Sequence, residues 1–319
     1  MPNADRTEFD LIARIRARVR DTDPALLLGI GDDAAVFTPT PGLAMVSTTD
    51  SLVSGRHFHD DWPAADLGHL ALAVNLSDLA AMGARSRWAL LALTLPEADP
   101  DWLEGFLDGF LALGESSGTA LIGGNLAAGP LNLGVHLIGE VAPSGLARRR
   151  GARVGDRVLV TGTLGDAAAA LSLGEAAHSC LQRRLRRPQP RLAAGAHLAG
   201  KVSAMIDVSD GLLADLGHLL EDGLGAEIEL ASLPASTALQ VAIEQAELRW
   251  QLQLAGGNDY ELLMTARPEQ VPALVQAMDQ LKLGLTDIGR VTDHGRVDCR
   301  CPDGGLLKTV RSGWDHFAD

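Results

Sequence analysis

The sequence predicts an α+β protein built from two domains. At 319 residues, the chain is longer than most chains that fold around a single hydrophobic core. Its first half alternates strand-like apolar runs with helical stretches, a pattern that favours one mixed sheet. Turn-forming residues and arginines then replace the apolar pattern over 142–155, which predicts a boundary there. We therefore expect an N-terminal domain over residues 1–143 and a C-terminal domain over residues 150–319.

Apolar spacing locates the elements of the first half. Apolar residues at helical spacing, with arginines between them, predict a short amphipathic helix at the start, and apolar runs bounded by turn-forming or polar residues predict strands. In chain order we expect a helix over 8–20, strand-like runs within 26–37 and 43–50, a helix over 70–83, a strand over 88–95, a helix over 102–115, a strand over 120–122 that leads into a Gly123-Gly124-Asn125 turn, and a strand over 131–141.

The same criteria locate the elements of the second half. A basic stretch broken by prolines, 183–191, is interpreted as a surface loop. In chain order we expect a strand over 157–161, a helix of alanines and leucines after Asp166, a strand ending at Asp207 or Val208, a helix beginning near Ser209 or Asp210, a Gly256-Gly257 turn feeding a strand, a helix over 271–283, a strand over 288–291 and an aromatic tail over 313–317.

Composition and charge exclude several classes of function. A net charge of -14 argues against a surface for nucleic acid or for an anionic membrane. It permits a small anionic substrate, because bound divalent cations can reverse the local charge. No apolar signal segment opens the chain, and no apolar run reaches the roughly 20 residues of a membrane span. The 3 cysteines suit a reducing compartment, so we expect a cytoplasmic protein.

The predicted helix over 70–83 carries two polar side chains in an apolar setting. The stretch is rich in Ala and Leu and ends at Gly83. It is apolar almost all the way round, which is typical of a buried helix, yet Asn75 and Asp78 lie on one face. Burying an unpaired carboxylate is costly. Asp78 is therefore expected to bind a metal ion, to pair with a distant arginine, or to be protonated.

Further acidic residues follow the apolar strands. Asp32 and Asp33 form a corner after a Gly-Ile-Gly sequence, and Asp50 closes the next strand after Thr48 and Thr49. A plain turn also explains an Asp pair. The hydroxyl groups beside Asp50 are hard oxygen donors of the kind that Mg²⁺ prefers, which favours a cation site.

Three other groups have alternative interpretations. Ser209 and Asp210 are good helix N-caps, but two acids and a serine around one helix start also resemble a site for a cation and a phosphate. The loop with His57 and His59 is a weak zinc signal; a histidine that faces a phosphate or a substrate, or one that is merely exposed, suits it better. The run 148–150 is either a solvated linker or contains an arginine that reaches a polyphosphate.

Together these acids predict magnesium chemistry. Asp33, Asp50, Asp78, Asp207 and Asp210 have hydroxyl or amide neighbours and no adjacent lysine. Oxygen-only ligand sets suit Mg²⁺ rather than zinc, and several Mg²⁺ ions are the natural partners of a nucleoside triphosphate. The sequence contains neither the P-loop motif nor the signatures of protein kinases.

Five motifs in this order resemble those of the bacterial thiamine-monophosphate kinases, and the resemblance covers nearly the whole chain. They are Gly-Ile-Gly-Asp-Asp-Ala-Ala-Val-Phe at 29–37, Ser-Thr-Thr-Asp-Ser-Leu-Val-Ser-Gly-Arg-His-Phe at 47–58, Ala-Val-Asn-Leu-Ser-Asp-Leu-Ala-Ala-Met-Gly-Ala at 73–84, Ile-Asp-Val-Ser-Asp-Gly-Leu at 206–212 and Gly-Gly-Asn-Asp-Tyr-Glu-Leu at 256–262. The family belongs to the aminoimidazole-ribonucleotide-synthetase-like superfamily. The resemblance implies a two-domain α+β fold, with an N-terminal mixed sheet that dimerises and a C-terminal α/β sandwich.

The resemblance also implies an activity and a site. ATP, as co-substrate, would transfer its γ-phosphate in line to the phosphate of thiamine monophosphate, without a covalent enzyme intermediate. Several Mg²⁺ ions would assist, in a homodimer with no nucleic-acid or membrane partner. The Mg²⁺ ligands would be Asp33, Thr48, Thr49, Asp50, Asp78, Asn125, Asp207 and Asp210. Asp78 and Asp210 would be catalytic; Gly124, Arg149 and Ser209 would bind ATP; and His57, Asn258 and Trp314 would bind thiamine monophosphate.

This chain departs from the family pattern at two positions. Many relatives carry Asp at the position of Asn125 and Glu at that of Asn258, so each replacement removes a negative charge. Two alternatives remain open at the level of sequence. One is a catalytically silent scaffold that binds a magnesium nucleotide, and the other is a different ATP-using enzyme of the same superfamily.

Overall fold

The computed structural model describes residues 7–19 and 23–307. The predicted aromatic tail, including Trp314, lies outside these residues. The chain divides into two compact units: the first comprises the residues up to Leu79 with Ala84–Pro143, and the second comprises Ala80–Gly83 with the residues from Ser144 onward. Each unit combines a mixed sheet with helices, which confirms the predicted α+β class. No helix within the described ranges is both long enough and apolar enough to cross a membrane.

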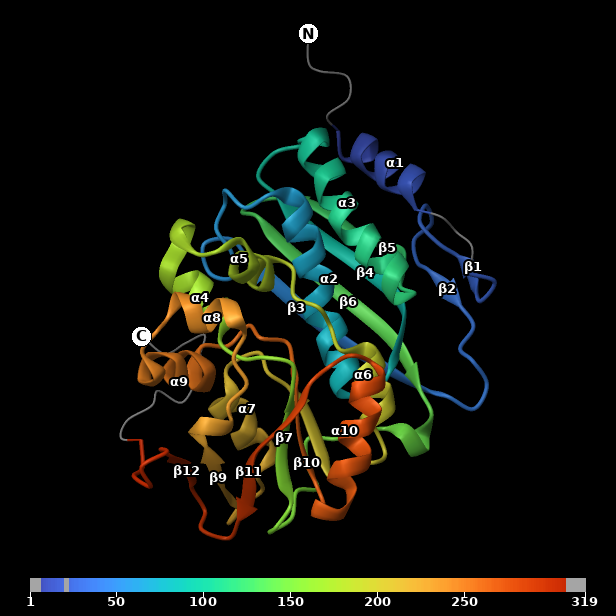
Figure 1. The fold of residues 1–319 in the computed structure, drawn as a ribbon. Coiled ribbons are helices and arrows are strands. Elements are labelled where there is room, and N and C mark those ends of the chain that lie inside the picture. The colour runs from blue at the N-terminus through green and yellow to red at the C-terminus, as the bar shows by residue number, and fades with distance from the viewer. Residues whose placement is uncertain (1–6, 20–22, 308–319) are drawn as a thin grey trace. The chain divides into compact units, whose positions relative to one another are not determined.

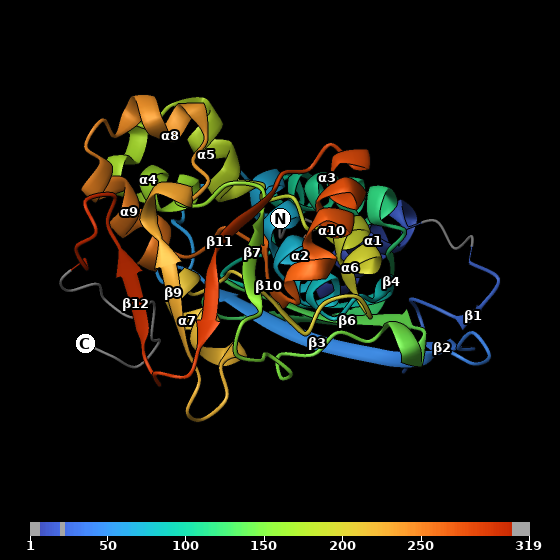
Figure 2. The ribbon, with the colours of Figure 1, turned by 60° about the horizontal axis from the view of Figure 1, so that its bottom comes forward.

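The first unit contains a four-stranded sheet in the order β3-β6-β4-β5 and a separate β1-β2 ribbon. Strands β4 and β5 are parallel and the other neighbours antiparallel. Helices α2 and α3 cover one face of the sheet (Figures 1 and 2). The elements are α1 (Glu8–Arg18), β1 (Leu26–Leu28), β2 (Val36–Phe37), β3 (Ala44–Val53), α2 (Ala64–Ala81), β4 (Arg85–Leu95), α3 (Pro100–Ser117), β5 (Ala120–Ala128) and β6 (Asn132–Val141).

The alternation of β3 decides which of its side chains approach the helices. Every second residue from Ala44 to Leu52 is at least partly buried, whereas those from Met45 to Val53 are exposed. Successive strand residues point to opposite faces of a sheet. One face of the sheet therefore packs on α2 and α3, and the other, here called the open face, carries the exposed residues.

The second unit contains a six-stranded sheet in the order β12-β9-β11-β7-β10-β8, antiparallel except for β9 and β12. Apolar clusters fill both of its faces: α7 and α9 pack on one, and α6 and α10 on the other. The elements are β7 (Arg157–Thr161), α4 (Asp166–Leu173), α5 (Ser179–Arg186), α6 (Leu192–Leu198), β8 (Ala204–Asp207), α7 (Leu212–Leu219), β9 (Gly225–Glu229), α8 (Thr237–Ala242), α9 (Ala246–Ala255), β10 (Leu262–Ala266), α10 (Val271–Gln280), β11 (Leu285–Thr292) and β12 (Val297–Arg300), with short 3-10 turns at 143–145, 174–176, 230–232 and 268–270.

Several predicted boundaries were wrong for local physical reasons. The expected turn at Gly123-Gly124-Asn125 lies inside β5, because both glycines are paired with β4. Asp50 lies within β3 and not at its end, since the pairing with β6 continues to Val53. Helix α2 begins at Ala64, earlier than expected.

Candidate functional site

In the first unit, the helix-covered face brings Thr48 and Asp78 together. The hydroxyl of Thr48 on β3 donates to Asp78 Oδ2 on α2, with 2.5 Å between the two oxygens. Asp50 lies two residues further along β3 and points to the same face. These three predicted ligands thus share one side of the sheet, and all supply oxygen atoms.

Thr49 and Asn125 lie on the open face. The Thr49 hydroxyl donates to the Val135 carbonyl at 3.0 Å. Asn125 is exposed and pairs across the strands with Ala92, in the same cross-strand row as Ser51, which is also exposed. The predicted magnesium ligands of this unit are therefore divided between the two faces of the sheet.

Gly124 meets a steric requirement of the sheet. Its φ is 155°, and a Cβ atom there would lie 1.9 Å from the carbonyl oxygen of Leu91. Only glycine allows this approach of β5 to β4. Strand pairing alone is sufficient to explain this glycine, and its contact with ATP stays a prediction.

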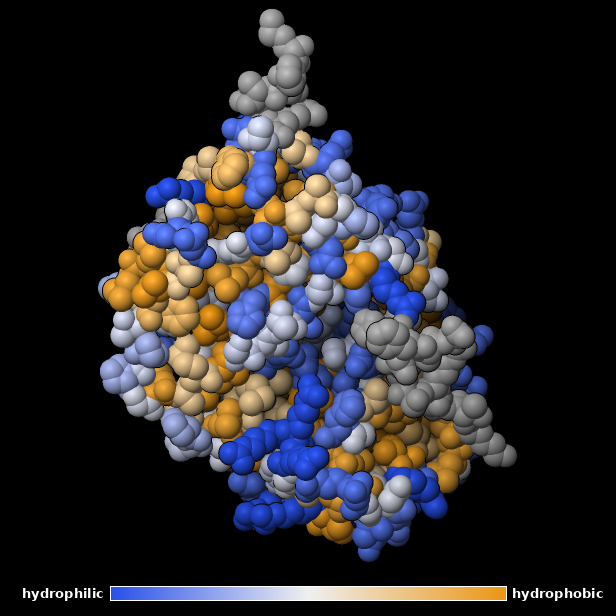
Figure 3. Space-filling view, turned by 180° about the vertical axis from the view of Figure 1, so that it is seen from behind, coloured by the Kyte–Doolittle hydropathy of each residue, from blue (hydrophilic) through white to orange (hydrophobic). Residues whose placement is uncertain are grey.

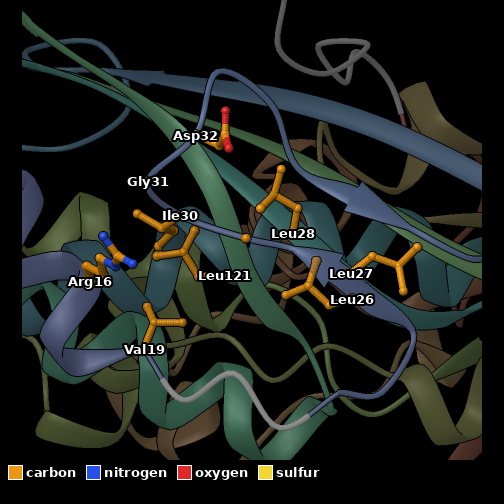
Figure 4. A pocket seen from close by; sticks show the side chains of 10 residues that line it. Arg16, Val19, Leu26, Leu27, Leu28, Ile30, Gly31, Asp32 and Leu121 are labelled. Carbon is orange, nitrogen blue, oxygen red and sulfur yellow. The ribbon is translucent and has the colours of Figure 1, made fainter.

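The acidic corner borders a cavity of the first unit. Asp32 and Asp33 are exposed, and the Asp33 N–H donates to Asp32 Oδ1 at 2.9 Å. The cavity, of about 410 Å³, is lined mainly by apolar residues of β1 and of the segment after it, together with Arg16 of α1 (Figure 4). The Arg16 guanidinium lies against Gly31, so the cavity combines an apolar wall with charged groups.

His57 is held in one tautomer by its own turn. The Val53 N–H donates to His57 Nδ1 at 2.9 Å, so this nitrogen is the acceptor and Nε2 carries the ring hydrogen. The imidazole is only partly buried.

In the second unit, the segment after β8 is fixed by an aspartate that the sequence analysis missed. The N–H groups of Ser209, Asp210 and Gly211 donate to Asp215 Oδ2 at 3.0, 3.1 and 3.1 Å. Helix α7 begins after Gly211 without a side-chain cap, so the expected N-cap role of Ser209 or Asp210 was wrong. The signal for this arrangement was an acidic residue in the first turn of a helix that follows a glycine.

Burial and the neighbouring Asp210 raise the pKa of Asp215 to about 7, although the three N–H donors act in the opposite direction. Asp207, at the end of β8, is 4% exposed. Arg149 is exposed and follows Arg148, whose carbonyl accepts from the Met205 N–H of β8 at 2.8 Å.

The loop before β10 lies directly against the Ser209 segment. The Asn258 N–H donates to the Ser209 carbonyl and the Tyr260 N–H to the Val208 carbonyl, each at 2.8 Å. Gly257 has a φ of 67°, and a Cβ atom there would lie 2.6 Å from the Ser209 carbonyl oxygen. The structure thus places the predicted ATP-binding Ser209 beside the predicted substrate-binding Asn258.

A buried ionic cluster lies next to this loop. Glu261 is fully buried and accepts hydrogen bonds from Arg184, Arg191 and the Thr161 hydroxyl, at 2.5 to 2.8 Å. The interpretation of 183–191 as a surface loop was therefore wrong, because two of its arginines neutralise this carboxylate. Burial also raises the pKa of Asp259 well above its usual value.

The described residues contain no group of three His, Cys, Asp or Glu side chains that could hold a metal ion. Of the predicted oxygen donors, Thr48, Asp50 and Asp78 share one face of the sheet in the first unit, and Asp207, Ser209 and Asp210 lie close together in sequence at the end of β8 in the second. Both sets have the hard oxygen chemistry that fits Mg²⁺.

The two units correspond to two known domain families. Residues 31–141 match the AIR synthase related protein, N-terminal domain, and residues 153–302 match the corresponding C-terminal domain. The chain is 42% identical over 322 residues to the thiamine-monophosphate kinases of Salmonella typhimurium and of Escherichia coli K12, covering 98% of this chain and 98% of each relative.

Solved structures give the same result. The crystal structure of thiamine-monophosphate kinase from Stenotrophomonas maltophilia matches with a TM-score of 0.85 and 45% identity, over 94% of this chain and 98% of that one. AaThiL complexed with AMPPCP and TMP matches with a TM-score of 0.76 and 33% identity, over 97% of both chains. The chain therefore belongs to the thiamine-monophosphate kinase family, within the AIR synthase related proteins.

Proposed function

We propose that this chain transfers the γ-phosphoryl group of ATP to the phosphate of thiamine monophosphate, forming thiamine diphosphate and ADP. Its full-length similarity to thiamine-monophosphate kinases carries the proposal. The similarity to AaThiL in complex with AMPPCP and TMP supports the choice of both substrates.

The two sets of predicted oxygen donors support a magnesium-dependent reaction. In the first unit, Thr48, Asp50 and Asp78 would hold Mg²⁺ on the helix-covered face of the sheet, and Asp33, which precedes them in the sequence, would be a further ligand. In the second unit, Asp207 and Asp210 would hold Mg²⁺. Thr49 and Asn125 point to the open face and would serve a separate ion. Mg²⁺ bound at these residues would offset the negative charge of two phosphorylated molecules brought close together.

The protein's own part in the reaction is orientation and charge. The attacking phosphate oxygen of thiamine monophosphate is already ionised near neutral pH, so no general base is required and an in-line transfer suffices. As magnesium ligands, Asp78 and Asp210 would hold the cations that offset the negative charge of the reacting groups. The Asp215 contacts hold the Ser209 segment rigid, which suits a segment that positions ATP. Arg149 and Gly124 would add contacts to ATP, and His57, Asn258 and Trp314 contacts to thiamine monophosphate.

The open face of the first sheet supports the proposal of a homodimer. Met45 and Val53 are 41% and 39% exposed on β3, and Figure 3 shows apolar residues interspersed with polar ones on the side seen from behind. A second copy would bury this face. Met45→Asp should then shift the sedimentation coefficient from dimer toward monomer, and an unchanged dimer would contradict the use of this face.

The function is tested by incubating the full chain with ATP, Mg²⁺ and thiamine monophosphate and measuring thiamine diphosphate by chromatography. We expect magnesium-dependent formation of thiamine diphosphate and an equal amount of ADP. ATP binding without any thiamine diphosphate would overturn the proposal and favour a nucleotide-binding scaffold.

A further inference from the structure

Tyr260 holds the side chain of Asn258. It is the chain's only tyrosine, is 8% exposed, and donates its hydroxyl hydrogen to Asn258 Oδ1 at 3.2 Å. This contact therefore engages the oxygen of the amide. In the part of the chain that the structure describes, Asn258 Nδ2 donates no hydrogen bond, and the side chain is only partly buried.

The backbone around this pair adopts an unfavourable conformation. Asn258 and Tyr260 have φ values of 58° and 51°, in the left-handed region that residues other than glycine rarely adopt, Asn more readily than Tyr. Hydrogen bonds from both N–H groups to the carbonyls of Ser209 and Val208 keep the loop in this form. These two hydrogen bonds therefore hold the backbone at both ends of the Tyr260–Asn258 contact.

We propose that Tyr260 is a positioning residue that determines which group Asn258 presents to the phosphate-accepting substrate. With Oδ1 occupied by the phenol, Asn258 presents the N–H donors of Nδ2. The substrate must then offer a hydrogen-bond acceptor at this point, such as a ring nitrogen or a phosphate oxygen. The inference rests on the proposed function, in which Asn258 contacts thiamine monophosphate.

Steady-state kinetics of the full chain separate this role from a structural one. Tyr260→Phe keeps the buried ring and removes only the hydroxyl. We expect the KM for thiamine monophosphate to rise about 5-fold, the equivalent of one hydrogen bond of roughly 1 kcal/mol, while kcat and the KM for ATP stay within about 2-fold. An equal rise of both KM values, or a fall in kcat alone, would overturn the proposal.

Two Asn258 variants test the polarity of the contact. Asn258→Asp keeps an acceptor for the Tyr260 hydroxyl but replaces the outward N–H groups by a carboxylate oxygen. It should therefore raise the KM for thiamine monophosphate more than Asn258→Ala does. In the Asn258→Ala background, Tyr260→Phe should add no further change. A lower KM for Asn258→Asp than for Asn258→Ala, or full additivity of the two changes, would contradict the inference.

The single tyrosine allows a readout that is independent of turnover. With 3-fluorotyrosine incorporated, the full chain gives one ¹⁹F resonance from this side chain. Thiamine monophosphate alone should shift that resonance, and AMPPCP alone should not; Asn258→Ala should abolish the shift. Equal shifts with both ligands would overturn the inference. A shift with thiamine monophosphate in a chain that forms no thiamine diphosphate would instead show failure of the proposed function alone.

Discussion

Thr48 Oγ1 and Asp78 Oδ2 lie 2.5 Å apart, joining the first long strand to the central helix of its unit. The hydroxyl donates to the carboxylate and so directs one of its oxygens. The pair gives the Asp78 carboxylate a hydrogen-bond donor on a helix rich in Ala and Leu. It also sets the geometry of the proposed magnesium site.

Removing the charge of Asp78 should reduce turnover far more than removing its partner. We expect Asp78→Asn to lower kcat about 100-fold, since it would remove a charged ligand of the proposed magnesium ion that stabilises the transferred phosphoryl group. Thr48→Val should cost about 10-fold, as loss of an orienting contact to a ligand does. Thiamine diphosphate formation across a magnesium titration measures both. Turnover of Asp78→Asn within a few-fold of the parent, at saturating magnesium, would contradict this role.

The Glu140 carboxylate should stabilise the first unit in a pH-dependent way. It is 1% exposed and bonded to Thr40, Arg85 and Arg87. Burial acts to raise its pKa, but these partners together lower the pKa of Glu140 to about 2, from 4.5. Because the folded-state pKa is below the unfolded one, the stabilisation is present above about pH 4.5 and is lost as the pH falls toward 2.

Glu140→Gln should therefore lower the free energy of unfolding on the order of 3 kcal/mol near neutral pH, since it breaks a buried ionic cluster. The difference from the parent should shrink progressively in acid. Urea unfolding at a series of pH values measures it, and Glu97→Gln, at an exposed glutamate of the same unit, is the matched control. A difference that does not change with pH would argue against this assignment.

Asp215 should have the opposite pH dependence. Its pKa in the folded protein, about 7, is above the ordinary value of 3.8, so its contribution favours the folded state at low pH and declines as the pH rises through 7. Asn keeps an acceptor oxygen for the three N–H groups but cannot ionise. We expect the stability of Asp215→Asn relative to the parent to increase between about pH 5 and pH 8.

Unfolding measurements at these two pH values check this prediction. Asp222→Asn, at an exposed aspartate of the same unit, should show no such trend. A parent that gains stability relative to Asp215→Asn as the pH rises would contradict the raised pKa.

The sequence was sufficient to predict elements whose residues all lie in the same environment, such as a strand that is buried on both faces. The apolar run of β7 was predicted at its observed bounds, 157–161, because a strand buried on both faces carries a continuous apolar signal. The fold class and the family followed from the order of the motifs.

Contacts between residues that are far apart in the chain could not be predicted from the sequence pattern. The stretch with Arg184 and Arg191 was interpreted as a surface loop, yet both arginines pair with Glu261, which lies 77 and 70 residues away. Thr49 and Asp50 point to opposite faces because they are consecutive in one strand. Which of the two faces the helices, and that Asn125 lies on the side of Thr49, depends on strand pairing, which residue types alone do not specify. Asp215 was overlooked because its three partners are backbone groups.

Direct transfer of the phosphoryl group is tested by following the γ-phosphorus of isotopically labelled ATP through a single turnover with magnesium and thiamine monophosphate. We predict that the label is found in the terminal phosphate of thiamine diphosphate, in equal amount to the ADP formed, with none bound to the protein. Label released as inorganic phosphate, or retained covalently on the chain, would contradict the account.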